Sequence, residues 1–415
     1  MTLAILLFAF LSLFLTKNTR ISTLSIAFLL YAFSIYLLEL NIIKIRQLSF
    51  YTKLFMFACY FMLIVGAFIG SNFKHKTLMR SKINLTLEKK IFLYSITISL
   101  ISILLNTFYM IKSTSGFLEF FLRYNELYGK RIAGTHSVLI PYLNSLIYIS
   151  ASAGGAILAN GKKESKTIYG VFPVLLIIVD SIINFGRANM LIGVIIFSTS
   201  YFSSVYRNNN YKLRFRLNSF LKLFTLFTLL ILMMVQIRKF RGGFENYSYN
   251  DNVVIEKLVD WGLFTPSFIL YFAGAPAVLN QTFGSSLLES DDVILENTFA
   301  PISRIYAPVF DKEVKRYEEF VNIGPRYSNT GTMFKDFLLD FGIFGTLIFT
   351  LFLGILYGIS YRYYLRTGNL YLYSFLSAYI VMGAFVNLFR SGQFLLPFLI
   401  VLLTIISQKI RWRQP

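Results

Sequence analysis

Five arginines stand close to the ends of long apolar stretches, where a chain that crosses a membrane would meet water. A guanidinium presents a planar fork of donors that matches phosphate oxygens, and a partly desolvated site strengthens each pair. If several of these arginines converge, they could neutralise a phosphate or pyrophosphate at the membrane surface. Each could instead reach a lipid headgroup or pair with a loop carboxylate on its own. The five are Arg187, Arg238, Arg241, Arg326 and Arg390.

Asp180 lies inside the apolar sequence LLIIVDSIINFGR. An ionisable group in such a stretch is costly and usually faces the helix bundle or a wet cavity. Arg187 follows seven residues later, which is about two helical turns, so the two side chains share a face if the helix continues between them. The carboxylate would then orient the arginine and line a substrate cavity. Alternatively, it makes a structural pair with another nearby cation.

His136 and Asp336 are the candidate groups for proton transfer. His136, in GKRIAGTHSVLIPYLN, could act as a general base near neutral pH, although a histidine at a helix start can equally contact a headgroup or the backbone. Asp336 and Asp340 follow the polar run RYSNTGT and share one face of the next helix at i and i+4. Asp336 either serves that helix N-terminus, which favours carboxylates, or faces the same cavity as the arginines.

The elements that position these residues are transmembrane helices. Of the 415 residues 56% are hydrophobic and 14% are charged, about half the charge of a soluble protein. The sequence therefore predicts an all-α polytopic membrane protein. With one cysteine and two histidines, a disulfide framework is excluded and a metal cage is disfavoured. About eleven spanning helices are expected, over residues 2–16, 21–43, 54–70, 91–111, 137–159, 168–185, 188–206, 223–237, 336–361, 370–389 and 393–408.

Charge predicts the orientation of these helices, because lysine and arginine accumulate in cytoplasmic connections. Residues 71–90 hold six basic side chains and one acid, and residues 207–222 hold five and none. With these two connections inside, the N-terminus lies outside and the C-terminus inside. Residues 281–335, with six basic and eight acidic side chains, then fall on the outer face.

Three regions follow from this topology. Residues 1–237 carry about eight helices, 238–335 form one large external loop, and 336–415 carry about three more helices. Within the loop, residues 261–280 are apolar, but a full crossing there would place the acid-rich 281–335 inside. We therefore expect a re-entrant or interface-lying helix, broken at Pro266, Gly274 and Pro276.

Several local patterns occur in order along the chain. IRKFRGG (237–243) opens the large loop, and FILYFAGAPAVLN (268–280) lies within it. NTGTMFKDFLLDFGIFGTL (329–347) leads into the next helix, and GRANML contains an Arg-x-x-x-Leu pattern in Arg187 and Leu191. Arg123 and Gly134 have ten residues between them. These patterns and the layout of nearly the whole chain resemble the O-antigen polymerases, the Wzy-type oligosaccharide repeat-unit polymerases of bacterial envelopes.

This resemblance implies a metal-independent membrane glycosyltransferase that needs no cofactor. Such an enzyme moves a growing glycan from undecaprenyl pyrophosphate to the non-reducing end of a new lipid-linked repeat unit, on the periplasmic face of the inner membrane. Its partners would be the two lipid-linked oligosaccharides, membrane lipids, and a chain-length regulator and a flippase, and no nucleic acid. The implied catalytic residues are Arg187, His136 and Asp336. The implied substrate-binding residues are Arg238, Arg241, Arg326, Arg390, Arg123 and Asp180.

Two alternatives stay open. An O-antigen ligase would have the same layout and chemistry, but ligases generally offer a histidine in the large loop, and residues 238–335 contain none. A lipid-linked oligosaccharide flippase or other transporter would be non-enzymatic. Transporters usually show short external loops and internal repeats, whereas this chain has one dominant loop and no visible repeat.

Overall fold

The computed structural model divides the chain into two compact units. The first unit comprises residues 1–81, 246–368 and 376–395, and the second comprises 82–245, 369–375 and 396–415. Within them the structure describes residues 19–40, 45–72, 84–114, 116–124, 126–127, 142–160, 166–184, 186–209, 266–283, 295–312, 320–324, 327–328 and 331–411. Two predicted helices, 2–16 and 223–237, lie outside the described residues.

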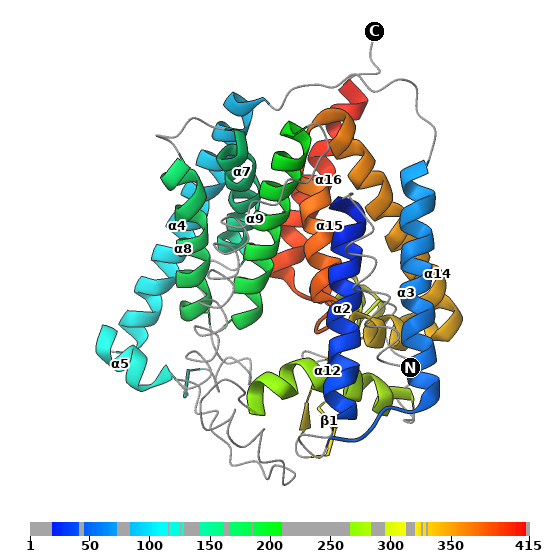
Figure 1. Ribbon diagram of the computed structural model, residues 1–415. Coiled ribbons are helices and arrows are strands. Elements are labelled where there is room, and N and C mark those ends of the chain that lie inside the picture. The colour runs from blue at the N-terminus through cyan, green and yellow to red at the C-terminus, as the bar shows by residue number, and fades with distance from the viewer. Residues whose placement is uncertain are drawn as a thin grey trace. The chain divides into compact units, whose positions relative to one another are not determined.

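Helices make up almost all of the described structure (Figure 1). The first unit contains α2 (Thr19–Glu39), α3 (Phe50–Asn72), α12 (Pro266–Phe283), α13 (Ala300–Tyr306), the 3-10 turns η4 (Ala307–Phe310) and η5 (Leu388–Arg390), and α14 (Met333–Thr367). The second contains α4 (Leu85–Ser113), α5 (Phe117–Leu122), the turn η1 (Leu143–Leu146), α7 (Ile147–Asn160), α8 (Lys166–Ile183) and α9 (Arg187–Asn208). The helices α15 (Tyr371–Met382) and α16 (Gly392–Arg411) have residues in both units.

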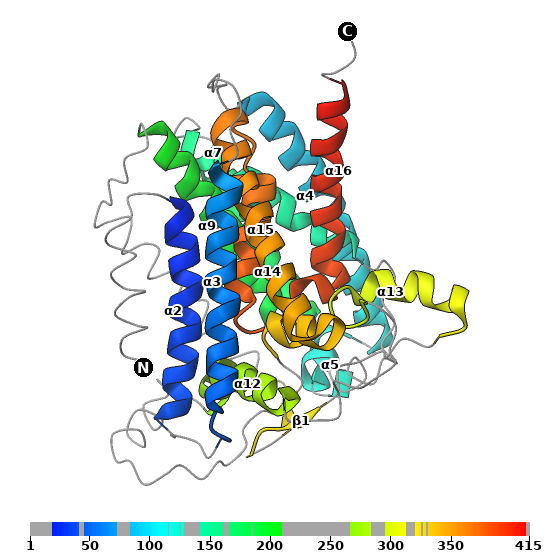
Figure 2. The same cartoon turned by 90° about the vertical axis from the view of Figure 1, so that its right-hand side faces the viewer.

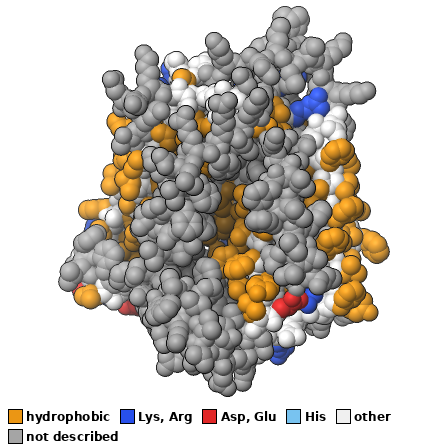
Figure 3. Space-filling model, viewed as in Figure 1, with side chains coloured by type: hydrophobic (Ala, Val, Ile, Leu, Met, Phe, Trp, Pro, Cys, Tyr) orange, Lys and Arg blue, Asp and Glu red, His pale blue; other side chains and the backbone are white. Residues whose placement is uncertain are grey.

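Four helices among the described residues are long and apolar enough to cross a membrane: α3, α4, α9 and α14. Their outward side chains suit lipid. On α3, Phe57, Phe61, Ile64 and Phe68 are exposed and recur every three to four residues, which places them on one face. Figure 3 shows hydrophobic side chains over this part of the surface. The prediction of a nearly all-helical protein is therefore confirmed, and these four helices are consistent with a membrane protein.

The helices α3 and α14 run side by side in both ribbon views because glycines let their backbones meet (Figures 1 and 2). Gly66 and Gly70 on α3 face Gly354 and Gly358 on α14, so each helix contributes a Gly-x-x-x-Gly pair. A Cβ at any of the four would overlap a backbone oxygen of the other helix. Such close approach gains van der Waals packing where the hydrophobic effect offers little between helices in lipid.

The second unit uses the same device between α7 and its neighbours. A Cβ at Gly154 would overlap the backbone oxygen of Tyr169 on α8, and one at Gly155 would meet that of Phe197 on α9. The hydroxyl groups of Ser152 and Ser200 lie 2.7 Å apart across the α7–α9 contact. Small side chains thus bring three helices together and satisfy their own polar atoms.

The helix α12 lies crosswise to α2 and α3 near one of their ends (Figures 1 and 2). Its carboxamide residue Asn280 holds the connection between those two helices, accepting from the Ser49 backbone N–H and the Thr52 hydroxyl, both at 2.8 Å. The predicted breaks at Gly274 and Pro276 are wrong, because α12 is continuous from Pro266. Pro276 lacks an N–H and its ring crowds the carbonyl four residues earlier, yet the helix continues through it to Phe283.

A two-stranded antiparallel ribbon packs beside α12. The strands β1 (Val321–Asn322) and β2 (Tyr327–Ser328) pair with Val321 opposite Ser328 and Asn322 opposite Tyr327. The backbone oxygen of Ile323 accepts from the Arg46 N–H at 2.9 Å, which ties this ribbon to the α2–α3 connection.

Several predicted boundaries differ from the structure. Within the helix expected over 137–159, residues 137–141 lie outside the described residues, Tyr142 has a left-handed backbone, a 3-10 turn follows it, and the α-helix begins at Ile147. The helix expected over 370–389 ends at Met382, where the chain turns at residues 383–385. The helix expected over 336–361 spans Met333–Thr367 but is interrupted at Gly342, whose φ of 65° and ψ of −173° favour glycine.

Candidate functional site

A polar cluster lies in the first unit, around the start of α14. We call it the α14 cluster, and its members come from the turn 295–298, the first turns of α14, the end of α15 and the turn after it. The cluster residues are Asn297, Thr298, Asp336, Asp340, Tyr379, Asn387 and Arg390.

Asp340 anchors the turn that precedes α13. One carboxylate oxygen accepts from the backbone N–H and from the side-chain amide of Asn297, at 3.1 and 3.0 Å. The other accepts from the backbone N–H of Thr298 at 2.6 Å. Among the described residues no cation forms an ion pair with Asp340. Three donors thus fix the position of this carboxylate beside the turn.

Arg390 approaches the same turn from the other side. Its guanidinium donates to the backbone oxygen and to the side-chain oxygen of Asn297, both at 3.4 Å. Asn297 therefore lies between a carboxylate and a guanidinium, with its amide nitrogen toward one and its oxygen toward the other. The arginine is half-buried, which strengthens its field relative to a solvated position.

Asn387 joins the turn to α15. Its amide donates to the backbone oxygen of Thr298 at 3.2 Å, and its oxygen accepts from the Tyr379 hydroxyl at 2.9 Å and from the Phe389 N–H at 3.2 Å. The first residue of α14 holds the turn after α15, because the Met333 N–H donates to the Gly383 oxygen at 2.8 Å. These bonds explain why the helix ends at Met382 and why residues 387–390 stand next to Asp340.

Asp336 is almost fully buried, with 3% of its surface exposed, and so is its neighbour Lys335. Asp336 lies one turn before Asp340 in α14, as predicted from their i, i+4 spacing. The Thr298 hydroxyl donates to its backbone oxygen at 3.4 Å, and the Tyr379 side chain lies within electrostatic range of Asp336. This helix start therefore buries two ionisable groups, Lys335 and Asp336, that are adjacent in the sequence. Buried charges persist only when they are compensated.

Aromatic rings enclose the cluster. Phe299 stacks on Phe389 with 5.2 Å between ring centroids, and Tyr379 stacks on the same ring at 4.0 Å. Phe337 and Phe341 contact Phe349 on the side of α14. These rings border the buried members Thr298 and Asn387, where low local polarity strengthens each hydrogen bond.

Asp180 occupies a second buried polar site, in the second unit. It is 3% exposed, and the amides of Asn144 and Asn184 both donate to one of its carboxylate oxygens at 2.7 Å. Tyr148 on α7 is within electrostatic range. These contacts hold the end of α8 against the chain that enters α7.

The condition for the predicted alignment of Asp180 with Arg187, one helix continuing between them, is not met. The helix α8 ends at Ile183, and α9 begins at Arg187 after Gly186, so no continuous helix joins the two residues. The side chain of Arg187 is outside the described residues. Of Arg187 the structure gives only the backbone position, at the first residue of α9.

Arg123 follows α5 and makes an exposed, bidentate ion pair with Glu126, at 2.8 and 2.7 Å. The neighbouring carboxylate raises the pKa of Arg123, which stays charged in any case. The other predicted residues His136, Arg238, Arg241 and Arg326 lie outside the described residues. Of the predicted arginines whose side chains are described, Arg390 alone lies in the α14 cluster.

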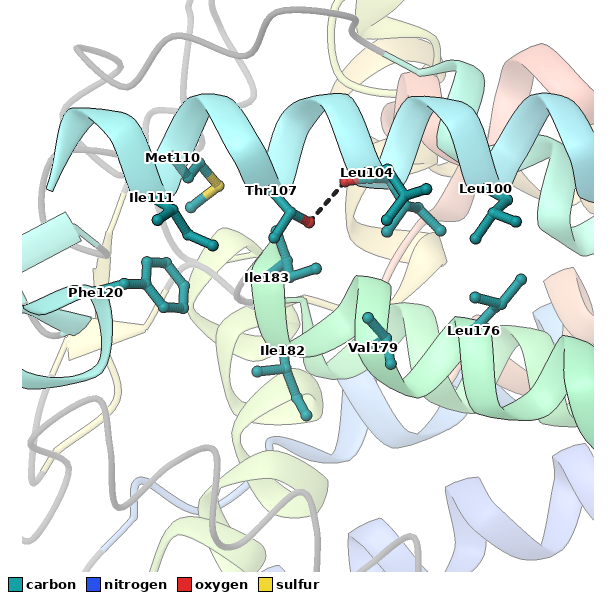
Figure 4. Close-up of a pocket in the computed structure, with 11 residues that line it drawn as sticks. Leu100, Leu104, Thr107, Met110, Ile111, Phe120, Leu176, Val179, Ile182 and Ile183 are labelled. Carbon is teal, nitrogen blue, oxygen red and sulfur yellow. Dashed lines mark hydrogen bonds between the residues drawn. The ribbon is translucent and has the colours of Figure 1, made fainter. Parts of the chain in front are cut away.

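An apolar pocket of about 310 Å³ opens in the second unit between α4, α8 and α5 (Figure 4). Leu104, Met110, Val179 and Phe120 are among the side chains that line it. Its one hydroxyl, on Thr107, donates to the Ile103 backbone oxygen at 2.6 Å and is satisfied there. The pocket therefore has the lining of a site for a hydrocarbon chain rather than for a polar ligand.

Asn297 and Asn387 did not stand out in the sequence. Each is a single amide with no motif around it. The partners of Asn297 lie 43 and 93 residues away in the sequence, and the most distant partner of Asn387 lies 89 residues away. A weak signal exists, because both occur in short polar interruptions of apolar sequence, ENT and NLFRSG. Such interruptions mark places where buried polar groups need partners.

Comparison with known proteins adds no assignment. No family model, no curated protein and no solved structure matches this chain. What the chain does has therefore to be argued from its own residues and from the layout that they form.

Proposed function

We propose that this protein is an oligosaccharide repeat-unit polymerase of the bacterial envelope. The observation that carries the proposal is the α14 cluster, where two carboxylates and a guanidinium lie around one turn at the start of an apolar helix, with Asp336 buried and Asp340 and Arg390 partly exposed. The order of local sequence patterns and the single large loop support the same function. In this proposal that loop and the cluster face the periplasm, and α12 lies along the membrane surface.

The reaction has a simple balance. A hydroxyl oxygen at the non-reducing end of the acceptor attacks the anomeric carbon of the donor glycan. The bond between that carbon and the pyrophosphate oxygen breaks, and undecaprenyl pyrophosphate leaves with the electron pair. The hydroxyl proton passes to a protein base. No oxidant, reductant or nucleotide is consumed.

The described residues suit the two requirements of this step. Arg390 would neutralise the charge that develops on the leaving pyrophosphate, which is the largest effect available to such a site. Asp336, buried at the start of α14, would accept the proton of the acceptor hydroxyl. Asp340 is already held by three donors and would serve to position the turn rather than to take the proton.

The remaining assignments keep their status as predictions. Arg187, Arg238, Arg241 and Arg326 would add positive charge for the second pyrophosphate, and His136 is the alternative base. We assign Asp180 to the structure of the second unit, because two amides hold its carboxylate. The apolar pocket beside α4 suits the chain of a lipid-linked substrate, although the proposal does not depend on it.

The test is reconstitution of the purified protein in liposomes with a lipid-linked repeat unit, without nucleotide sugar and with a chelator. A ladder of longer lipid-linked glycans is the expected product. Transfer to a lipid A core without a ladder would favour the ligase. Movement of the lipid across the bilayer without lengthening would favour a flippase and refute the proposal.

A further inference from the structure

We infer that Asn297 is a positioning residue, which holds the guanidinium of Arg390 at a set distance from Asp340 by bonding to both at once. The inference rests on the proposed function for its catalytic meaning, and on the contacts of Asn297 for its structural content.

Asn297 makes four hydrogen bonds to two charged side chains. Its backbone N–H and side-chain amide both donate to Asp340, and its backbone and side-chain oxygens both accept from Arg390. Every polar group of Asn297 is thus used, two toward an anion and two toward a cation. An asparagine that only filled a turn would need none of the side-chain bonds.

The side-chain amide of Asn297 is neutral, which distinguishes it from an aspartate at the same position. An aspartate at 297 would bind the guanidinium directly and reduce the positive charge that it can offer to a ligand. A neutral amide orients the guanidinium without cancelling its charge. It also keeps Asp340 out of ion-pairing distance of the arginine, which agrees with the ion pairs found among the described residues.

The residues that follow Asn297 are held firmly in place. The next residue, Thr298, is fully buried, and Asn387 fixes its backbone oxygen. Phe299 stacks on Phe389, which directly precedes Arg390. The turn therefore cannot shift without moving the arginine, and a loss of the amide should be felt as a loss of orientation.

The first test needs no enzymatic activity. Arg390 in the purified full-length protein is modified with phenylglyoxal, and the rate is followed by peptide mass spectrometry. In N297A the guanidinium loses its bond to the side-chain oxygen and keeps the one to the backbone oxygen, so it is less well held and should react several-fold faster than in wild type. The matched control is N208A, which removes an amide bound to Asn160 at 2.8 Å in the second unit and should leave the rate unchanged. An unchanged rate in N297A would overturn the inference.

The second test uses the polymerisation assay. N297A should lower kcat on the order of ten- to a hundredfold with KM nearly unchanged, the range for a hydrogen bond to a charged group. In an R390K background the same truncation should cost much less, because the residue acts through the arginine. Equal losses in both backgrounds would show a merely structural role and refute the inference.

The charged analogue completes the design. In N297D a carboxylate faces Arg390 directly and lies beside Asp340, so kcat should fall while the modification rate of Arg390 stays as low as in wild type or lower. A normal kcat in N297D would count against the inference, because the neutral amide would then be dispensable. If wild type shows the expected arginine protection but lengthens no glycan, the proposed function fails while the positioning role stands.

Discussion

The two units each bury an aspartate on an apolar helix, but they surround it differently. Asp180 in the second unit accepts from the amides of Asn144 and Asn184. Asp336 in the first unit lies one turn from another carboxylate, in a cluster that includes the guanidinium of Arg390. A carboxylate held by neutral amides is suited to join helices. Ionisable groups of both signs in one partly buried site are suited to move a proton and to stabilise a leaving anion.

The largest effect should come from Asp336. Asp336→Asn keeps the shape and removes the base, so kcat should fall by about 10²–10⁴-fold, the usual contribution of a positioned base. Steady-state kinetics with a lipid-linked repeat unit measure this. A variant with near-normal kcat would shift the proton transfer to another group, with His136 as the first alternative.

Arg390→Gln should follow closely. Loss of one electrostatic stabiliser in a preorganised site lowers kcat by about 10²–10³-fold. The effect should appear in kcat more than in KM, because the charge on the pyrophosphate grows as its bond breaks. If KM alone rises, Arg390 binds the substrate and the transition state equally.

The corresponding change in the second unit should affect stability instead. Asp180→Leu leaves buried amide donors of Asn144 and Asn184 without their partner, which costs about 2 kcal/mol of unfolding free energy. Asp180→Asn should be milder, and its kcat per folded molecule should stay within a few-fold of wild type. Unfolding in detergent and kinetics on the folded fraction separate the two effects. A kcat loss as large as that of Asp336→Asn would break the comparison and restore Asp180 to the substrate cavity.

The two units should differ least in the effect of glycine substitutions, because both use glycines for close helix packing. Gly354→Ala and Gly155→Ala each force a Cβ against the backbone of a neighbouring helix, so each should lower stability by about 1–2 kcal/mol. Thermal unfolding in detergent measures both. Gly274→Ala is the control, because its nearest neighbour would be an ordinary 3.7 Å from the new Cβ. If that control is as harmful, close helix approach does not explain the two glycines.

Much of the helical layout could be predicted, because the length and apolarity of a spanning segment are local properties of a sequence. The helix ends were harder, since tertiary contacts decide them. At Gly383 the backbone oxygen receives the hydroxyl of Tyr31 and the N–H of Met333, from two other helices. Nothing within the sequence of α15 announces those partners.

The candidate site was predictable only in part. Asp336 and Arg390 stand out because charged residues are rare next to apolar stretches. The turn that connects Arg390 with Asp340 depends on Asn297 and on contacts between distant segments. Its chemistry becomes visible only once the fold brings these segments together.

The most direct measurement of the central claim counts the leaving group. In liposomes that contain the protein and a lipid-linked repeat unit, one undecaprenyl pyrophosphate should be released for each glycosidic bond formed. Asp336→Asn and Arg390→Gln should abolish both products together, while Asp180→Asn retains them. Lengthening without equal release, or full activity in the two α14-cluster variants, would contradict the account.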